Sequence, residues 1–144
     1  MAEEPRFIVR EADWRRDKGA LEGIRKTVFI EEQGVPAEME WDGLDERAWH
    51  ALAVDSGGEP VGCGRLLPNG NIGRMAVLKN WRRRGVGSAL LHALVSKAKA
   101  LEFGYIYLHA QTYVNEFYER HGFMRSGEEF MEAGIPHVKM IRRS

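Results

Sequence analysis

Seven consecutive residues in the second half of the chain have side chains and backbone freedom suited to holding a phosphate group. They are Arg82, Arg83, Arg84, Gly85, Val86, Gly87 and Ser88. Glycines leave neighbouring backbone N–H groups open to an anion, and arginine side chains pair with phosphate oxygens. This basic turn (residues 82–88) therefore predicts a cradle for a pyrophosphate group.

The elements on either side of the basic turn favour the same prediction. A short apolar run, residues 75–78, precedes it and indicates a strand. Apolar residues recur at helical spacing from Val86 to Leu101, and Gly104 supplies a stop signal. The order is thus strand, turn and helix, and a helix N-terminus offers unpaired N–H groups and the positive end of the helix dipole.

Judged from these residues alone, the basic turn also has less specific interpretations than a phosphate cradle. A G-x-G pair often marks only a turn, and three arginines are typical of a solvated surface. A nucleotide-binding protein for ATP or NAD is disfavoured, because Leu90 stands where the third glycine of the dinucleotide fingerprint would fall. No G-x-x-x-x-G-K-[ST] phosphate loop occurs either.

Two spaced motifs resemble the GNAT acetyltransferase superfamily. Residues 82–87 match its R-x-x-G-x-G acetyl-CoA signature, and residues 115–123, NEFYERHGF, resemble its N-x-x-F-Y-x-x-x-G-F stretch with one residue fewer between Asn and Phe. Residues 28–33 and 130–138 resemble the branch called ElaA-like. The resemblance implies an α/β (α+β) GNAT fold, with a mixed central β-sheet, a splayed parallel strand pair and flanking helices.

The resemblance also assigns roles to individual residues. Acetyl-CoA is the implied donor, and its pantetheine arm would bond to the free backbone groups of Met75, Ala76 and Val77. One of their N–H groups would hold the oxyanion. Asn115 would bond the pantetheine or phosphate portion. Tyr118 would protonate the leaving thiolate, since a tyrosine of pKa about 10 keeps its proton at pH 7. The alternative for Tyr118 is a packed aromatic with a polar tip.

The base that would deprotonate the acceptor is less clearly marked. A lysine-like amine of pKa about 10.4 costs about 4.6 kcal/mol to neutralise at pH 7. Several family members carry a Glu on the strand before the cradle, but residues 69–77 contain no acid. The candidates are Glu32, His50 and His109, and a route through water is equally open. His109 could instead be a core or hydrogen-bonding residue, and Glu32 could be only an exposed helix charge.

Composition limits the remaining classes of function. The 144 residues carry 21 basic and 21 acidic side chains, which disfavours nucleic acid and anionic membranes as partners. One cysteine excludes an internal disulfide, and no signal peptide or membrane-length apolar run occurs, so we expect a cytoplasmic protein. The histidines lack metal-binding spacing, which predicts no metal. The length predicts one domain, residues 1–144.

The rest of the chain reads as alternating strands and helices. We expect strands at residues 7–9, 50–54, 60–67, 72–78 and 105–110, helices at 20–32, 86–101 and 115–120, and a closing hairpin of 123–125 with 138–141. The acidic stretch, residues 31–45, is either a solvated loop or a wall of the acceptor site that attracts an amine. Cys63 is expected to be an inert core residue.

These observations predict an N-acetyltransferase. It would move an acetyl group from acetyl-CoA to a primary amine of a small molecule or peptide by direct attack in a ternary complex, because no nucleophile with a paired base is apparent. A different class stays open: a regulatory or scaffold domain that binds CoA but has lost catalysis. A homodimer formed through the last hairpin is compatible with the resemblance.

Overall fold

The computed structural model describes residues 6–143, in which strands and helices alternate. The strands are β1 (Phe7–Ala12), β2 (Trp49–Asp55), β3 (Pro60–Leu66), β4 (Ile72–Val77), β5 (Tyr105–Gln111), β6 (Met124–Arg125), β7 (Phe130–Glu132) and β8 (Ile135–Arg143). The α-helices are α1 (Trp14–Arg25), α2 (Ala37–Glu40), α3 (Val86–Ala100) and α4 (Asn115–Arg120). A π-helix, η1 (Lys26–Glu32), continues α1, and single 3₁₀ turns are η2 (Asp45–Arg47), η3 (Lys79–Trp81) and η4 (Thr112–Val114).

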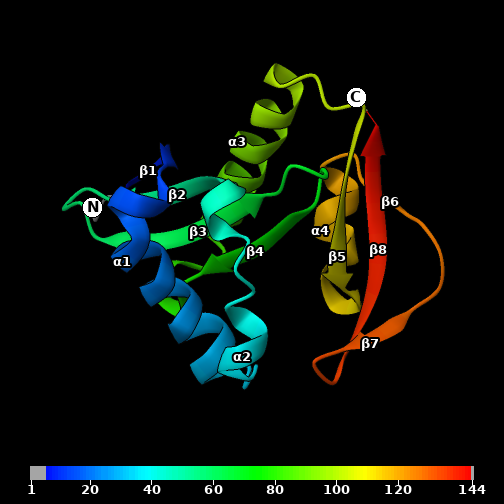
Figure 1. Ribbon diagram of the computed structural model, residues 1–144, viewed down its shortest axis with the longest axis horizontal. Helices are drawn as coiled ribbons and strands as arrows, with labels where there is room; N and C mark the ends of the chain where they lie inside the picture. Colours follow the sequence, from blue (N-terminus) through cyan, green and yellow to red (C-terminus); the bar gives the residue numbers. More distant parts are fainter. Residues whose placement is uncertain (1–5, 144) are drawn as a thin grey trace, which may run out of the picture.

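The strands form two antiparallel sheets, ordered β1-β2-β3-β4 and β5-β8-β6, with β7 paired to β8 (Figure 1). Strands β4 and β5 run parallel and meet only beside the start of β4, where Asn71 bridges Tyr107 and the Tyr107 N–H donates to the Gly70 carbonyl over 3.0 Å. Beyond that bridge the two strands diverge. The predicted α/β fold with a splayed strand pair is confirmed, and the mixed sheet is in fact two antiparallel sheets joined at this bridge.

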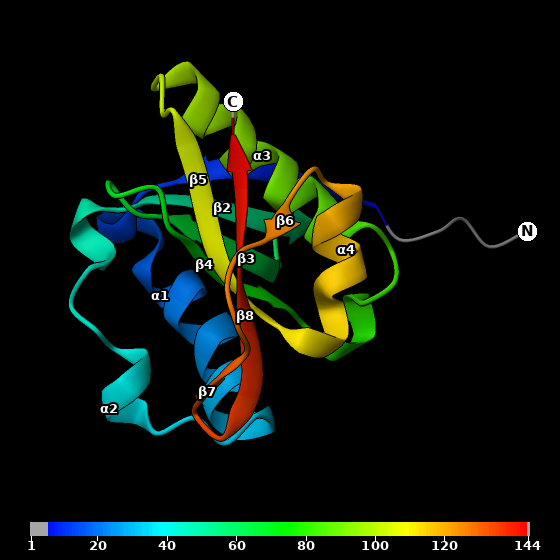
Figure 2. The ribbon, with the colours of Figure 1, turned by 90° about the vertical axis from the view of Figure 1, so that its right-hand side faces the viewer.

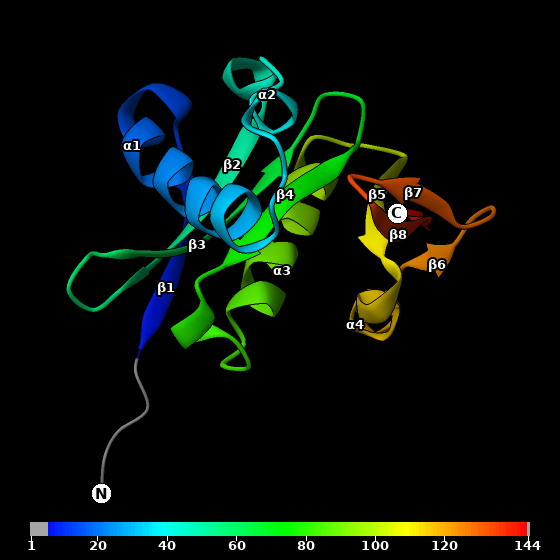
Figure 3. The ribbon, with the colours of Figure 1, turned by 90° about the horizontal axis from the view of Figure 1, so that it is seen from below.

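Helices cover both faces of the first sheet, with α1 on one side and α3 on the other (Figure 3). In the second sheet β5 and β8 lie side by side, and α4 packs on the face that also meets α3 (Figure 2). Helix α3 is the crossover that parallel strands require. The basic turn therefore lies at the C-terminal end of β4, beside the opening between the two sheets.

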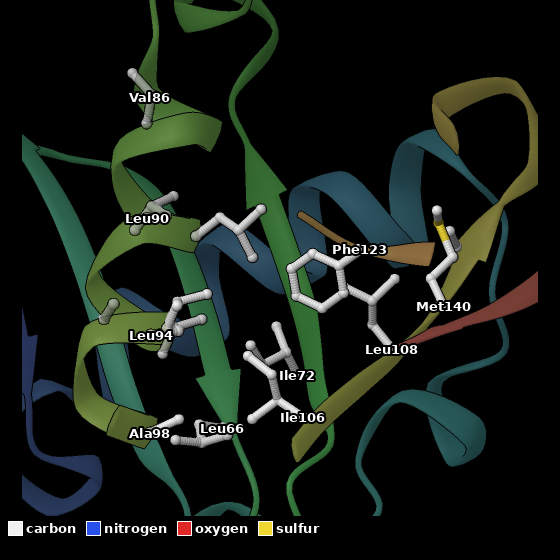
Figure 4. Close-up of a cluster of buried hydrophobic side chains, with 14 of the residues drawn as sticks. Leu66, Ile72, Val86, Leu90, Leu94, Ala98, Ile106, Leu108, Phe123 and Met140 are labelled. Carbon is white, nitrogen blue, oxygen red and sulfur yellow. The ribbon is translucent and has the colours of Figure 1, made fainter. Parts of the chain in front are cut away.

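The main core lies between α3 and the two sheets (Figure 4). Leu90 and Leu94 of α3 meet Ile106 and Leu108 of β5, and all four side chains are buried. Gly64 in β3 lets α3 pack closely on the sheet, because an added Cβ would lie 2.8 Å from a Leu94 methyl carbon and would displace that side chain. This core fixes α3, and with it the basic turn, against β4.

Helix α1 begins earlier and ends differently than the sequence indicates. Asp13 caps it, its carboxylate accepting from the backbone N–H groups of residues 15 and 16 over 2.9 and 3.0 Å. Gly19 and Gly23 weaken the helical pattern there, which explains the predicted start at residue 20. The C-terminal half of the predicted helix is the π-helix η1, which no feature of the sequence indicates.

The closing hairpin of β6 with β8 is confirmed, but its connection contains another strand. Phe130, Met131 and Glu132 form β7, which turns back onto β8. Ala133 and Gly134 make the turn with positive φ angles of 51° and 76°. The segment predicted as a connection thus presents ordered side chains beside β5.

Candidate active site

The basic turn has the geometry of an anion site. Gly85 is the N-cap of α3 with φ 86°, and no atom lies within 4 Å of a Cβ added there. Arg83 also has a positive φ, 63°. Alternating left- and right-handed residues make a concave nest of backbone N–H groups, and the first turn of α3 adds its own. The turn can therefore receive a phosphate group on its backbone.

Other residues of the turn lie beside α4. A Cβ added to Gly87 would lie 3.6 Å from the Phe117 ring. Ser88 Oγ lies 3.2 Å from His121 Nε2. The Val86 side chain is buried in the core, so only its backbone is available to a ligand. The two sequence motifs therefore meet in space at the start of α3.

The three arginines of the turn differ in their partners. Arg82 donates from Nε to the Val77 carbonyl over 2.9 Å and holds both Glu32 carboxylate oxygens at 3.0 and 2.8 Å. Arg84 donates to the backbone carbonyl of residue 80 and lies over the Trp81 ring. Arg83 is exposed and makes no hydrogen bond or ion pair with residues 6–143. It is thus the arginine most available to an incoming phosphate.

Strand β4 offers one backbone edge toward the opening. Its other edge pairs with β3, where Cys63 lies opposite Ala76 and Gly62 opposite Val77. A bulge at Arg74, with φ 52°, shifts the register just before Met75. Because β5 has diverged here, its backbone does not pair with Met75, Ala76 or Val77 within the described residues. The edge predicted to hold the pantetheine arm is thus unpaired by β5, although the Val77 carbonyl already accepts from Arg82.

The predicted residues of α4 lie on one side of that helix, beside the basic turn. The Tyr118 ring packs against Phe117 and Phe123, and burial, with a smaller effect of Tyr113, raises its pKa to about 12. Its hydroxyl has no hydrogen-bond partner among residues 6–143. Asn115 Oδ1 is buried and also has no partner within that range. A buried acceptor without a donor costs free energy, so Asn115 fits a ligand N–H group.

The three candidate bases have very different surroundings. The Glu32 carboxylate is engaged by Arg82. His50 is buried, stacks on Trp14, and lies 2.9 Å from the Asp45 carbonyl through Nε2. Burial lowers its pKa, and a ring so enclosed serves packing, so we do not retain it as a base. His109 is 39% exposed, and its Nδ1 lies 3.6 Å from a Glu132 oxygen.

A buried ionic network lies under the acidic stretch, which is therefore not simply a solvated loop. It joins three arginines of α1, β3 and β4 to three carboxylates: Arg25, Arg65, Arg74, Glu40, Asp42 and Asp45. Arg25 reaches Glu40 at 2.7 Å and Asp45 at 2.6 Å, and all three are nearly inaccessible to solvent. The sequence interpretation missed this network, although an arginine on the apolar face of α1 was a signal.

The network neutralises the predicted acidic wall. Asp42 is held by Arg65 at 2.8 Å; burial alone would raise the pKa of this carboxyl, but the Arg65 hydrogen bonds outweigh it and lower the pKa to about 2. With three carboxylates matched by three guanidinium groups, this part of the stretch does not present an anionic surface. Within the part of the chain that the structure describes, no group of three metal-ligating side chains could hold a metal ion.

Two further findings concern the reactivity of Cys63 and the lengths of the helices. Cys63 is buried, and burial raises the pKa of its thiol to about 12, which confirms the prediction of an inert cysteine. No helix within residues 6–143 is long and apolar enough to cross a membrane. A basic, glycine-containing turn at the mouth of two splayed strands, with a tyrosine-bearing helix beside it, is the arrangement that the GNAT acetyltransferase resemblance implies.

Comparison with known proteins identifies the family. Residues 16–144 match the acetyltransferase (GNAT) domain family. The N-acetyltransferase YjcF of Bacillus subtilis (strain 168), itself described as uncharacterized, is 40% identical over 123 residues, which cover 83% of this chain and 87% of YjcF. The chain therefore belongs to the GNAT acetyltransferase family.

Solved structures agree with this assignment. An acyl-CoA N-acyltransferase from Pseudomonas aeruginosa is 30% identical with a TM-score of 0.83, over 94% of this chain and 99% of that one. Escherichia coli ElaA is 26% identical with a TM-score of 0.86, over 96% of this chain and 100% of that one. The predicted family is confirmed, and ElaA itself is among the similar structures.

Proposed function

We propose that this protein transfers an acetyl group from acetyl-CoA to a primary amine in a ternary complex. The observation that carries the proposal is the open space at Gly85 beside an unpaired edge of β4. The pyrophosphate would bind the N–H groups of the basic turn, with Arg83 beside it, and the pantetheine arm would bond to the backbone of residues 75–77. Asn115 Oδ1 would accept from an amide of that arm.

The chemistry then needs two proton movements. The acceptor ammonium loses one proton to a base, for which Glu32, His109 and water are the candidates, and the neutral nitrogen attacks the thioester carbonyl. A backbone N–H of β4 stabilises the oxyanion. The C–S bond breaks as the C–N bond is completed, Tyr118 donates to the departing sulfur, and the second proton that the nitrogen loses replaces the one given to the sulfur. The products are an acetylated amine and CoA.

Calorimetric titration with acetyl-CoA tests the donor site. We expect micromolar binding to the wild type, with ATP and NAD as weakly binding controls. Gly85→Asp places bulk and negative charge where the phosphate would lie, so its affinity should fall at least about tenfold, which is about 1.4 kcal/mol. Gly127→Asp is the matched control, because Gly127 has φ 90° and open space but lies beyond β6. Equal acetyl-CoA affinity in wild type and Gly85→Asp would refute the donor site.

A CoA-binding domain without catalysis is the second candidate. The observation in its favour is the ion pair of Arg82 with Glu32, which occupies one candidate base. Release of free thiol from acetyl-CoA in the presence of a primary amine, followed by mass spectrometry of the acetylated product, separates the two. Tight acetyl-CoA binding without turnover of any amine would favour the regulatory domain.

A further inference from the structure

A cluster of rings and one carboxylate lies on the face of the second sheet that points away from α3. Glu132 of β7 lies between two imidazoles, 3.6 Å from His109 Nδ1 and 3.4 Å from His137 Nε2. Phe130 stacks on the His137 ring at 5.9 Å and meets the His109 ring edge-on at 5.1 Å. The structure thus gathers one anionic group and three rings, which we call the β7 cluster (Phe130, Glu132, His109 and His137).

The β7 cluster lies at the end of β5 where the two sheets have diverged. Along β5, residues 106, 108 and 110 are buried toward α3, so His109 and Gln111 point to the opposite face. Gln111 lies opposite His137 in the β5–β8 register and donates to Gln33, just after η1, over 3.4 Å. The end of η1 and strand β7 lie at the same end of the molecule (Figures 1 and 2).

Charge near the β7 cluster limits what can bind there. Glu132 is 47% exposed and is a carboxylate whose neighbours are imidazoles rather than arginines. Lys139 of β8, opposite His109 in the register, places its ammonium 4.8 Å from the Tyr107 ring centroid. A second positive charge on a ligand would therefore meet Lys139. The neutralised network under residues 40–45 offers such a charge no compensating anion.

We infer that the β7 cluster is the acceptor subsite and that it takes monoamines with an aromatic body. The ammonium pairs with Glu132, and the aromatic body packs against Phe130 and the imidazole rings. This inference rests on the proposed acetyl transfer. It favours aromatic monoamines over polyamines, a choice that the acidic composition of residues 31–45 does not suggest.

The same geometry assigns the base. His109 directs Nδ1 toward Glu132, which leaves Nε2 for the acceptor. Nε2 takes a proton from the ammonium, the imidazolium is stabilised by Glu132, and the neutral nitrogen attacks the thioester carbonyl. As the C–N bond is completed and the C–S bond breaks, the nitrogen loses its second proton, which neutralises the departing thiolate. The proton on His109 then passes to solvent. His109 is thus the catalytic base, while Glu132 binds the ammonium and positions the imidazole.

Initial rates of thiol release from acetyl-CoA test the inference, with 2-phenylethylamine and spermidine as probes. We expect a kcat/KM at least about tenfold higher for 2-phenylethylamine. Glu132→Gln should raise its KM about tenfold or more, and Glu132→Asp should restore part of that loss. His109→Gln should lower kcat about 10²-fold or more with a smaller effect on KM. Glu128→Gln is the matched control, since it removes an exposed charge from the same connection and should change neither constant.

The outcomes separate this inference from the proposed function. Equal KM values for Glu132→Gln and Glu128→Gln, or spermidine as the better substrate, would overturn the subsite while leaving acetyl transfer intact. A wild type that binds acetyl-CoA but acetylates neither amine would also overturn it and keep the donor site. Failure to bind acetyl-CoA at all would remove the proposed function itself.

Discussion

Replacing Tyr118 by Phe removes one hydroxyl from a ring whose packing against Phe117 and Phe123 stays intact. The pKa of Tyr118 is about 12, because burial disfavours the phenolate. A thiol has an ordinary pKa of about 8.5, so complete proton transfer from Tyr118 to a thiolate is uphill by about 4.8 kcal/mol. The hydroxyl should therefore act mainly by donating a hydrogen bond to the developing thiolate.

That role sets the size of the effect. A hydrogen bond to a charged group contributes about 1.5–3 kcal/mol, so Tyr118→Phe should lower kcat about 10- to 150-fold. Since the phenol keeps its proton well above pH 10, the wild-type rate should show no alkaline fall from this residue below about pH 11. A loss above about 10³-fold would indicate full proton transfer instead.

The assay follows thiol release from acetyl-CoA with the best amine, together with acetyl-CoA affinity by calorimetry. Affinity should be unchanged in Tyr118→Phe, because the hydroxyl acts only as charge develops on sulfur. Tyr105→Phe, at the opposite end of β5 from α4, is the control for loss of a tyrosine hydroxyl. Less than a threefold change in kcat for Tyr118→Phe would refute the reasoning.

Two further predictions concern stability. Hydrogen bonds from Arg10 lower the pKa of Asp17 from 3.8 to about 2, so the Asp17 carboxylate stabilises the fold above pH 3.8 and this contribution is lost as the pH falls toward 2. Asp17→Asn should therefore lower the free energy of unfolding in urea by about 2 kcal/mol at pH 7. A difference of the same size between variant and wild type at pH 2 would contradict this reasoning. Arg25→Met should lower the free energy of unfolding by about 3–5 kcal/mol in the same assay, because it leaves the buried Glu40 and Asp45 carboxylates with one arginine fewer. A loss below about 1 kcal/mol would show that the ionic network is not needed for stability.

The sequence predicted those parts of the site that depend on local spacing. The basic turn and residues 115–123 each lie within ten residues, so strand, turn and helix signals place their side chains without knowledge of the fold. Tyr118 and Asn115 share a side of α4 because they are three residues apart. The approach of Phe117 to Gly87 joins two separate segments, and no local spacing predicts it.

Features that join distant residues were missed for a physical reason. Arg25 lies 15 residues from Glu40 and 20 from Asp45, and no periodic pattern links ion pairs at such separations. The sequence predicted no role for Glu132, because the three-residue strand that positions it is too short to show alternation. The π-helix η1 likewise leaves no pattern in the sequence.

Two predicted roles compete beside η1: Glu32 as the base, and Arg82 as a partner of the pyrophosphate. Arg82 cannot present the same guanidinium nitrogen to Glu32 and to a phosphate. The pair of Arg82 with Glu32 is about 41% and 33% exposed, and exposed pairs contribute about 1 kcal/mol or less. A pyrophosphate carries more charge than one carboxylate and is also held by the backbone N–H groups of the turn, so a bound pyrophosphate should take Arg82 from Glu32. Glu32 then loses the partner that holds its carboxylate, whereas His109 keeps Glu132 beside Nδ1 to orient its ring and stabilise the imidazolium, which favours His109 as the base.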